Sequence, residues 1–514
     1  MHRDEPQIEQ SASRGAAIVL AIAAAKLLFQ LVVANRYGIF RDELYYLACS
    51  EHLDAGYVDQ PPAIAFICWM ARHVFGESLI GLRLLPALAG AATVWLTGKL
   101  ARDLGGGVFA QALAAFACFA APVFLLMHHW LTMNAFEPLI WLAAAWCIVR
   151  AIDRNEPRYW LWFGVLIGLG MENKYSTAFF AFAASAALLL TPQRRFLASR
   201  WIWIGAACSL AIFLPNLIWL VQHDFPFLEL MHNIRSTDRD VVRGPVAFVL
   251  DQAVLMNPVL FPLWAGGLGW LCLAREGSRF RILGWIYALL LVAFVVLKGK
   301  NYYLSAAYPM LFAAGAVGYE TLSRSRMRWS RPVYIGLIAA VTCLLAPLSV
   351  PVLSPESYIR YQRSIGFEPP KTENQRTGPL PQHFADEFGW EEMAREVGRV
   401  YNALPPDERA RTAIFANGYG QGGAIDFFGP KYGLPKAIGN HQNYWLWGPR
   451  EYTGERVIVL GSDGTGDREH FASVEAVGRT NHPCARRDEH FQIFLCRDLN
   501  TTLQKLWPKA KKWN

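Results

Sequence analysis

Residues 16–34, AAIVLAIAAAKLLFQLVVA, decide the class of fold. Only Lys26 and Gln30 interrupt this apolar run. An α-helix of about twenty apolar residues is needed to cross the roughly 30 Å apolar core of a bilayer. Arg14 precedes the run as in a signal peptide, but no A-x-A cleavage site ends it. We therefore interpret residues 16–34 as a membrane anchor that the protein retains.

Similar apolar runs recur as far as residue 353. The chain is 54% hydrophobic, above the usual share of roughly 45–50% in soluble proteins. We predict an all-α membrane domain of about eleven transmembrane helices, with thirteen as the upper bound, plus juxtamembrane helices. The predicted spans are about 16–35, 79–100, 107–127, 131–150, 158–171, 175–190, 201–221, 246–273, 281–298, 302–320 and 333–353. Pro62–Phe75 is short and contains Arg72 and His73, which predicts a juxtamembrane or re-entrant helix.

The net charge of +8 comes largely from arginines in short loops between the apolar runs. Positive loops remain in the cytoplasm, so this charge indicates orientation in a membrane, and no nucleic-acid partner is expected. Arg-rich loops alternate with loops such as 36–60 and 222–245. The alternation predicts a multi-pass protein of the bacterial inner membrane with a cytoplasmic N-terminus. The C-terminal part is then outside the cytoplasm.

Composition changes after residue 353 and divides the chain into three predicted parts. Residues 1–353 form the membrane domain, 354–385 an irregular linker, and 386–514 an extracytoplasmic soluble α/β domain. Helical spacing over 390–404 and near 421–432 alternates with short apolar runs at 413–416, 457–460 and 491–496. Cys484 and Cys496 lie in the third part. If that part faces an oxidising compartment they can form a disulfide, and otherwise they are two free thiols.

The loop after the first apolar run, YGIFRDELYYLACSEHLDAGYVDQPP at 37–62, is the most informative stretch for chemistry. The acidic pair Asp42-Glu43 stands near its start, close to the expected outer face of the membrane. A carboxylate in that position can act as a general base, and the alternative is an ordinary solvated acidic loop.

Two further stretches carry candidate site residues. In KGKNYY, Lys298 and Lys300 can reach a lipid-borne phosphate at the interface, beside Tyr302 and Tyr303. The alternative for this stretch is a membrane anchor with an aromatic belt. Lys174 is a weaker candidate of the same kind.

The short loop MHHWLTMNAFEP, residues 127–138, carries acceptor or second-loop candidates, namely His128, His129, Asn134 and Glu137. Adjacent histidines on a helix face different directions, and a metal site needs more ligands than this pair. We therefore predict no metal site. The sequence leaves open whether a divalent cation is required as a cofactor.

The order of these features resembles the GT-C glycosyltransferases. It is most similar to the protein O-mannosyltransferase and aminoarabinose transferase group, the PMT-like glycosyltransferase family 39. The similar stretches are the first outside loop, RLLPALAGAATVWLTGKLARDLGG at 83–106, GLGMENKYS at 168–176 and KGKNYYLSAAYPMLFAAGA at 298–316. The resemblance implies a GT-C fold and an enzyme that transfers a hexose or pentose from a polyprenyl-phosphate carrier. The acceptor is then a lipid, glycan or protein at the outer face of the inner membrane.

The resemblance also assigns roles to individual residues. Asp42 occupies the position of the family's catalytic carboxylate in the first loop, and Glu43 is the adjacent alternative. Relatives often carry a lysine before the paired prolines, where this chain has Gln60, and an acidic residue where it has Asn134. Besides the donor and the acceptor, membrane lipids are the expected partners. Two competing hypotheses are a transporter or flippase of lipid-linked sugars and a non-catalytic envelope assembly factor.

Overall fold

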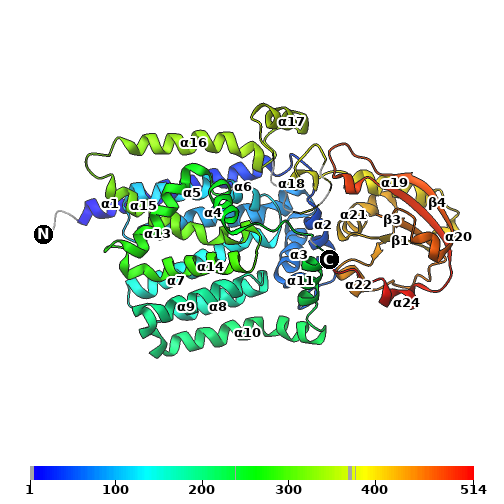
Figure 1. Cartoon of the computed structure of the whole chain (residues 1–514), viewed down its shortest axis with the longest axis horizontal. Helices are drawn as coiled ribbons and strands as arrows, with labels where there is room; N and C mark the ends of the chain where they lie inside the picture. The colour runs from blue at the N-terminus through cyan, green and yellow to red at the C-terminus, as the bar shows by residue number, and fades with distance from the viewer. Residues whose placement is uncertain (1–4, 238, 369–372, 375, 377) are drawn as a thin grey trace. The chain divides into compact units, whose positions relative to one another are not determined.

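A computed structural model describes residues 5–514, except 238, 369–372, 375 and 377 (Figure 1). The chain forms two compact units, and neither is a continuous segment. We call Met1–Asn35, Phe75–Ile218 and Val242–Val352 the helical unit. Arg36–Val74, Trp219–Val241 and Leu353–Asn514 form the mixed unit. The loop that follows the first apolar run thus belongs to the same compact unit as the C-terminal residues.

Every predicted span of the helical unit corresponds to one or more helices. These are α1 (Glu5–Val33), α4 (Leu79–Asp103), α5 (Val108–Ala120), α6 (Pro122–Met127), α7 (Met133–Asp153), α8 (Tyr159–Asn173), α9 (Thr177–Leu190), α10 (Arg200–Gln222), α12 (Pro245–Leu255), α13 (Phe261–Leu273), α14 (Arg281–Val296), α15 (Tyr308–Leu322) and α16 (Ser330–Ser349). Within the described residues, six helices are long and apolar enough to cross a membrane, or seven if the bent pair at 245–273 is one span. The multi-span helical fold is confirmed, and the number eleven remains a prediction.

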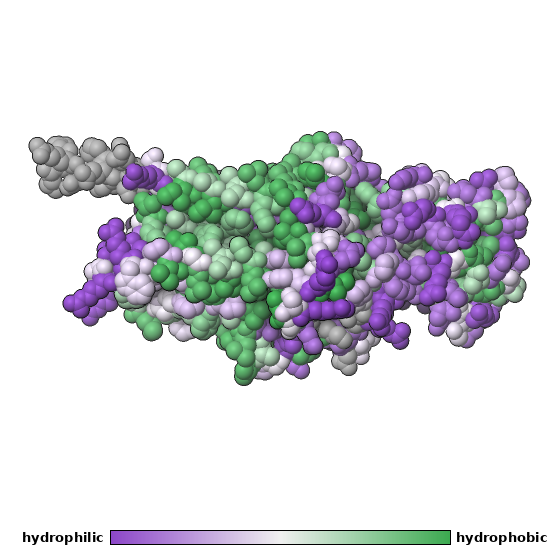
Figure 2. Space-filling view, turned by 90° about the horizontal axis from the view of Figure 1, so that it is seen from above, coloured by the Kyte–Doolittle hydropathy of each residue, from purple (hydrophilic) through white to green (hydrophobic). Residues whose placement is uncertain are grey.

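Large apolar side chains cover the outside of the helical unit. Figure 2 shows this surface as mostly green. Leu28 and Val32 on α1 are 63% and 65% exposed, and Trp203 on α10 is 63% exposed. A protein surrounded by water rarely exposes so many large apolar side chains, whereas lipid tails solvate them well. The helical unit therefore has the surface of an integral membrane protein.

Glycines allow helices in this unit to approach closely. A methyl group added at Gly315 of α15 would collide with the backbone oxygen of Leu263 on α13, and one added at Gly267 of α13 would collide with that of Leu311. Small residues at such crossings let two helix backbones pack directly, as is common in membranes. Replacing either glycine forces α13 and α15 apart.

The C-terminal part of the mixed unit contains a five-stranded sheet of order β2-β1-β3-β5-β4. Its strands are β1 (Thr412–Ala416), β2 (Ile438–Gly439), β3 (Arg456–Leu460), β4 (Phe471–Arg479) and β5 (Gln492–Leu499). β1 is parallel to β2 and β3, and β5 is antiparallel to β3 and β4. With α19 (Trp390–Asn402) and α21 (Tyr419–Phe428), this arrangement confirms the predicted α/β character.

Two sequence-based expectations for this part need correction. Residues 354–385 are not uniformly irregular, because they contain α17 (Pro355–Ser364) and α18 (Gln382–Ala385), while 369–372, 375 and 377 lie outside the described residues. Cys484 and Cys496 are both free thiols, so the disulfide is wrong and the alternative holds. Cys496 is fully buried on β5 and aligned with Val457 and Val474, which makes it a packing residue of the sheet.

Two further helices, α2 (Arg41–Ser50) and α3 (Ala63–Phe75), lie between the first and second predicted spans. α3 is among the shorter apolar helices, in agreement with the prediction of a short helix at 62–75. α2 packs on α21, where glycines again permit close approach. A methyl group at Gly423 would lie 2.7 Å from the backbone of Leu44, and one at Gly420 would lie 2.5 Å from Cγ of Arg41. This contact positions the acidic start of α2.

Candidate active site

The acidic pair at the start of α2 divides into two different environments. Glu43 is buried, and its carboxylate accepts a hydrogen bond of 2.9 Å from the backbone N–H of Phe40. That bond satisfies a backbone donor at the helix N-terminus. The side chain of Asp42 remains 30% exposed. Of the two predicted catalytic residues, Glu43 thus has a capping role, and the side chain of Asp42 is the one that solvent reaches.

Asp42 is held by a residue that lies 377 positions away in the chain. The Tyr419 hydroxyl donates to Asp42 Oδ1 over 2.8 Å, and Nε of Arg41 lies 3.4 Å from the same oxygen. Burial raises the pKa of the Tyr419 phenol well above its usual value, so the hydroxyl stays a donor at neutral pH. Oδ2 of Asp42 accepts no hydrogen bond from any residue that the structure describes. This oxygen can therefore accept a hydrogen bond from a further donor.

A second carboxylate, Asp59, lies in the same polar region and is absent from the candidates derived from sequence. The Tyr45 hydroxyl donates to Asp59 Oδ1 over 2.8 Å and accepts from Nδ2 of Asn443 over 2.8 Å. Burial, helped by the nearby charge of Asp42, raises the pKa of Asp59 to about 6. Its position directly before Gln60 and the paired prolines is the signal that sequence reading could have used.

Two arginines of the mixed unit, Arg239 and Arg486, are paired with carboxylates. Arg239, from the predicted loop 222–245, lies 3.1 Å from Glu373. Nε of Arg486 lies 2.7 Å from Asp386, and both of these side chains are buried. Gln60, directly before the paired prolines, is fully buried, and Nε2 of its side-chain amide lies 3.7 Å from Sγ of Cys49. The side chain of Gln60 is uncharged, so a cation for the donor phosphate has to come from another residue.

The helical unit gathers four of the other predicted residues around Lys174. Its ammonium donates to Asn134 Oδ1 and to Glu137 Oε2, each over 2.8 Å. The same ammonium lies 4.6 Å from the ring centre of Tyr303 and 5.8 Å from that of Tyr302. Asn134 and Glu137 are three residues apart on α7, so they share one face of that helix. Lys174, which contacts all four residues, is the side chain that the sequence indicated as a weaker candidate for the donor phosphate.

Glu137 is fully engaged in this cluster. Its second carboxylate oxygen accepts a short hydrogen bond from the Ser176 hydroxyl. With Lys174 on one oxygen and Ser176 on the other, Glu137 is a partner for the cation rather than an open base. An ammonium has three donors, and the described residues occupy two of those of Lys174. The third can bind a ligand oxygen.

The remaining predicted residues lie in other surroundings. Lys298 is exposed and has a positive φ of 55°, just after α14. Lys300 is half-buried at the start of the short 3-10 helix Asn301–Ala307.

The paired histidines are both buried. His128 Nδ1 contacts the backbone oxygen of Phe124 over 2.7 Å, and His129 Nε2 contacts Nη1 of Arg83 over 3.2 Å. Among the described residues, no group of three or more metal-ligating side chains comes together.

Comparison with known proteins places these features in context. Residues 59–219 match the family described as dolichyl-phosphate-mannose-protein mannosyltransferase. The chain is 26% identical over 342 residues to a lipid A galacturonosyltransferase of Rhizobium johnstonii, covering 64% of this chain and 70% of that protein. It is 29% identical over 191 residues to an undecaprenyl phosphate-α-4-amino-4-deoxy-L-arabinose arabinosyl transferase of Pseudomonas savastanoi, covering 33% and 34% of the two chains.

Solved structures show the same fold. The crystal structure of ArnT from Cupriavidus metallidurans bound to undecaprenyl phosphate superposes with a TM-score of 0.62 at 14% identity. The superposition covers 93% of this chain and 97% of that one. At this identity the likeness concerns the fold, which is a GT-C arrangement of membrane helices followed by a C-terminal α/β part.

Proposed function

Because the chain belongs to the PMT-like membrane glycosyltransferases, which use a lipid-phosphate-linked sugar donor, we propose that it transfers a sugar from a polyprenyl-phosphate carrier to a lipid-borne saccharide. The proposed acceptor is the sugar part of a lipid at the outer face of the bacterial inner membrane. The support for this acceptor is the similarity to a transferase named for lipid A, and the similarity to a transferase of undecaprenyl-phosphate-linked arabinose supports the carrier.

One observation carries the proposal for catalysis. Asp42 is reachable, is fixed by Tyr419 through one oxygen, and keeps Oδ2 open among the described residues. A hydroxyl is a poor nucleophile until a base accepts its proton, and a positioned base contributes typically about 10²–10⁴-fold in rate. Asp42 therefore has the exposure and the orientation that a general base requires.

The proposed reaction balances without any further co-reactant. The acceptor hydroxyl oxygen forms a bond to the anomeric carbon of the donor sugar, and its proton passes to Oδ2 of Asp42. The bond from the anomeric carbon to the phosphate oxygen breaks, and the carrier phosphate leaves with the electron pair. Negative charge grows on that phosphate as the bond breaks, so a nearby cation lowers the barrier.

Within the helical unit, Lys174 is the cation that best suits the carrier phosphate. It is nine-tenths buried, it is oriented by Glu137 and Asn134, and it has one ammonium hydrogen to spare among the described contacts. A buried, oriented cation interacts more strongly with a phosphate than a solvated one does. Lys298 and Lys300 remain proposed phosphate contacts at the membrane interface.

The test is transfer by purified full-length protein in lipid nanodiscs. The assay follows release of undecaprenyl phosphate from undecaprenyl-phosphate sugars, with lipid A as acceptor. Asp42→Asn should lower turnover by at least about 100-fold, because the amide keeps the shape of the carboxylate but cannot take the proton. Asp407→Asn, at an exposed aspartate of the same unit, is the matched control and should retain full turnover.

The outcomes separate the competing hypotheses. Wild-type turnover by Asp42→Asn would exclude Asp42 as the base. Movement of intact donor across the bilayer without cleavage would indicate a flippase. Neither cleavage nor movement with any of the arabinose, galacturonate and mannose donors would favour a non-catalytic assembly factor.

A further inference from the structure

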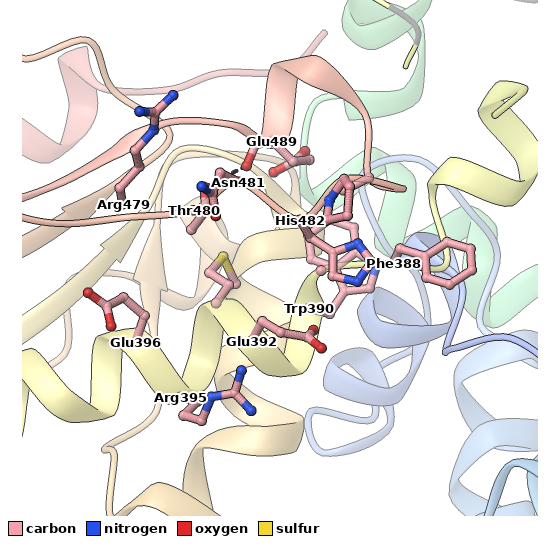
Figure 3. Close-up of a pocket in the computed structure, with 14 residues that line it drawn as sticks. Phe388, Trp390, Glu392, Arg395, Glu396, Arg479, Thr480, Asn481, His482 and Glu489 are labelled. Carbon is pink, nitrogen blue, oxygen red and sulfur yellow. Dashed lines mark hydrogen bonds between the residues drawn. The ribbon is translucent and has the colours of Figure 1, made fainter. Parts of the chain in front are cut away.

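The mixed unit contains a pocket that plays no part in the chemistry described above. Its volume is about 300 Å³, which is at the lower end of small-ligand sites. It lies between the first turns of α19 and the segment 479–489, which joins β4 to β5 (Figure 3). Glu392, Arg395 and Glu396 come from the helix, whereas Arg479, Asn481 and His482 come from the end of β4 and the turn after it.

The charged side chains of this pocket are unevenly paired. Glu396 receives two bonds from Arg399, of 3.0 and 2.7 Å, and Glu489 receives one of 3.0 Å from Arg486. Arg395 and Arg479 are exposed and make no hydrogen bond or salt bridge with the described residues. The side chains of Arg395, Arg479 and Glu392 can therefore contact a ligand in the pocket. Arginine forks suit carboxylate and phosphate groups, and the carboxylate of Glu392 suits hydroxyl donors.

An aromatic wall lies beside these charges. The rings of Phe388 and His482 stack with centroids 5.5 Å apart and an interplanar angle of 13°, and Tyr37 packs on Phe388. His482 and Phe388 both line the pocket. A flat ring surface next to separated anionic and cationic groups suits a sugar, whose C–H face is apolar and whose edge is hydroxylated. The arginines add a preference for a sugar that bears a negative charge.

The pocket is linked to Asp42 through one helix. Glu489, in the pocket, accepts a 3.0 Å hydrogen bond from Gln421, and Tyr419 of the same α21 holds Asp42. Residues two apart on a helix point to different sides, and a helix with its side chains is about 10 Å wide. A ligand in the pocket is therefore on another side of α21 from the catalytic carboxylate.

We propose that this pocket is a subsite for an anionic sugar of the acceptor, bound away from the hydroxyl that reacts. The inference rests on the proposed transfer to a lipid-borne saccharide and adds that the acceptor is an extended, negatively charged one. Occupation of the pocket then anchors the acceptor without contributing to cleavage of the donor.

The test measures binding and catalysis separately on the full-length protein in nanodiscs. Binding of trigalacturonate is measured by calorimetry against maltotriose, an uncharged trisaccharide, and against inorganic phosphate. The variant combines Arg395→Gln with Arg479→Gln, and its matched control combines Arg411→Gln with Arg468→Gln, two exposed arginines outside the pocket. We expect the pocket variant to bind trigalacturonate at least ten-fold more weakly and the control variant to bind it normally.

Each result has a defined meaning. The pocket variant should keep the rate of donor cleavage and raise the KM for a charged acceptor, whereas Asp42→Asn should lose turnover and keep trigalacturonate binding. Equal binding by wild type and pocket variant, or no binding at all, overturns the subsite. Phosphate binding as tight as that of trigalacturonate also overturns it, because the pocket is then a plain anion site. If the wild type binds trigalacturonate but neither it nor any variant transfers sugar, the proposed function is overturned. The class of ligand proposed for the pocket then still holds.

Discussion

At the scale of single residues, Tyr419 is the contact that orients the candidate base. Its hydroxyl bonds Asp42 Oδ1 over 2.8 Å, and a hydrogen bond to a charged group is worth about 1.5–3 kcal/mol. Tyr419→Phe should therefore lower kcat for transfer by about 10-fold or more while the acceptor KM changes little, because the base loses its orientation and not its substrate. The measurement is steady-state kinetics with the same donor and acceptor.

A matched control distinguishes positioning from general damage to the fold. Tyr432 also donates to a carboxylate of the mixed unit, that of Glu391, over 3.0 Å. Tyr432→Phe removes the same kind of bond at a site without a proposed catalytic role, and it should leave kcat unchanged. If both variants lose the same activity, Tyr419 acts only through the stability of the unit.

The pair formed by Lys174 and Glu137 allows a second prediction at this scale. Removing one partner of a buried ion pair leaves an uncompensated charge and costs about 3–5 kcal/mol. Lys174→Met should therefore lower the unfolding temperature markedly, and the double variant Lys174→Met with Glu137→Gln should recover much of it. Thermal unfolding of the protein in detergent measures both effects.

Transfer activity decides what Lys174 does beyond this pairing. If Lys174 also meets the donor phosphate, the double variant is stable but does not transfer sugar. A stable double variant with full turnover would make the pair purely structural and would return the phosphate role to Lys298 or Lys300.

At the scale of elements, α21 joins the acidic start of α2 to the sheet. Asp426, on the same helix, accepts a 2.8 Å bond from the backbone N–H of Ala437 and a 2.7 Å bond from the Tyr444 hydroxyl. Burial raises the pKa of Asp426 to about 6, despite these bonds. A carboxyl group with a raised pKa in the folded state binds its proton more tightly there than in the unfolded chain. Its contribution to stability is thus fully present below about pH 4 and is lost as pH rises through about 6.

Asparagine at position 426 imitates the protonated acid, because its amide can donate to the oxygen of Tyr444. Asp426→Asn should therefore gain stability relative to wild type as pH rises from 4 to 7, by up to about 3 kcal/mol for a shift of two pKa units. The measurement is the difference in unfolding temperature between variant and wild type across that pH range. Asp407→Asn, at an exposed position, should show no such trend, and a pH-independent difference for Asp426→Asn would contradict the argument.

At the scale of the whole molecule, the alternation of Arg-rich loops predicts the orientation. The arginines at 324, 326, 328 and 331 follow α15 and should be cytoplasmic, and one further span then places residues 354–514 outside. A phosphatase that is active only outside the cytoplasm, fused after Asn514, should be active. The same enzyme fused after Arg326 should be silent, and the reverse result would overturn the orientation.

Features that depend on local pattern could be predicted from the amino-acid sequence. The apolar run at 16–34 and its successors predicted a multi-span helical protein, because the length of a helix that crosses a bilayer is set by composition along the chain. Short apolar runs at 413–416, 457–460 and 491–496 likewise predicted a small α/β domain, and the order of motifs predicted the glycosyltransferase family, which comparison confirmed. Asp42 was accessible to this reasoning because it stands at a fixed place after the first span.

Contacts between side chains that are distant in the chain became known from the folded structure. The bond from Tyr419 to Asp42 joins residues 377 positions apart, and the cluster of Lys174 with Glu137 joins three helical segments. Neither contact can be predicted from hydrophobic periodicity. Periodicity indicates which face of a helix or strand is buried, but not which element packs against that face. Glu43 shows the same limit, since it reads as a twin of Asp42 in sequence and differs only because its carboxylate turns back to Phe40. Residues that are adjacent in sequence can therefore have different environments, because burial and bonding partners depend on the fold.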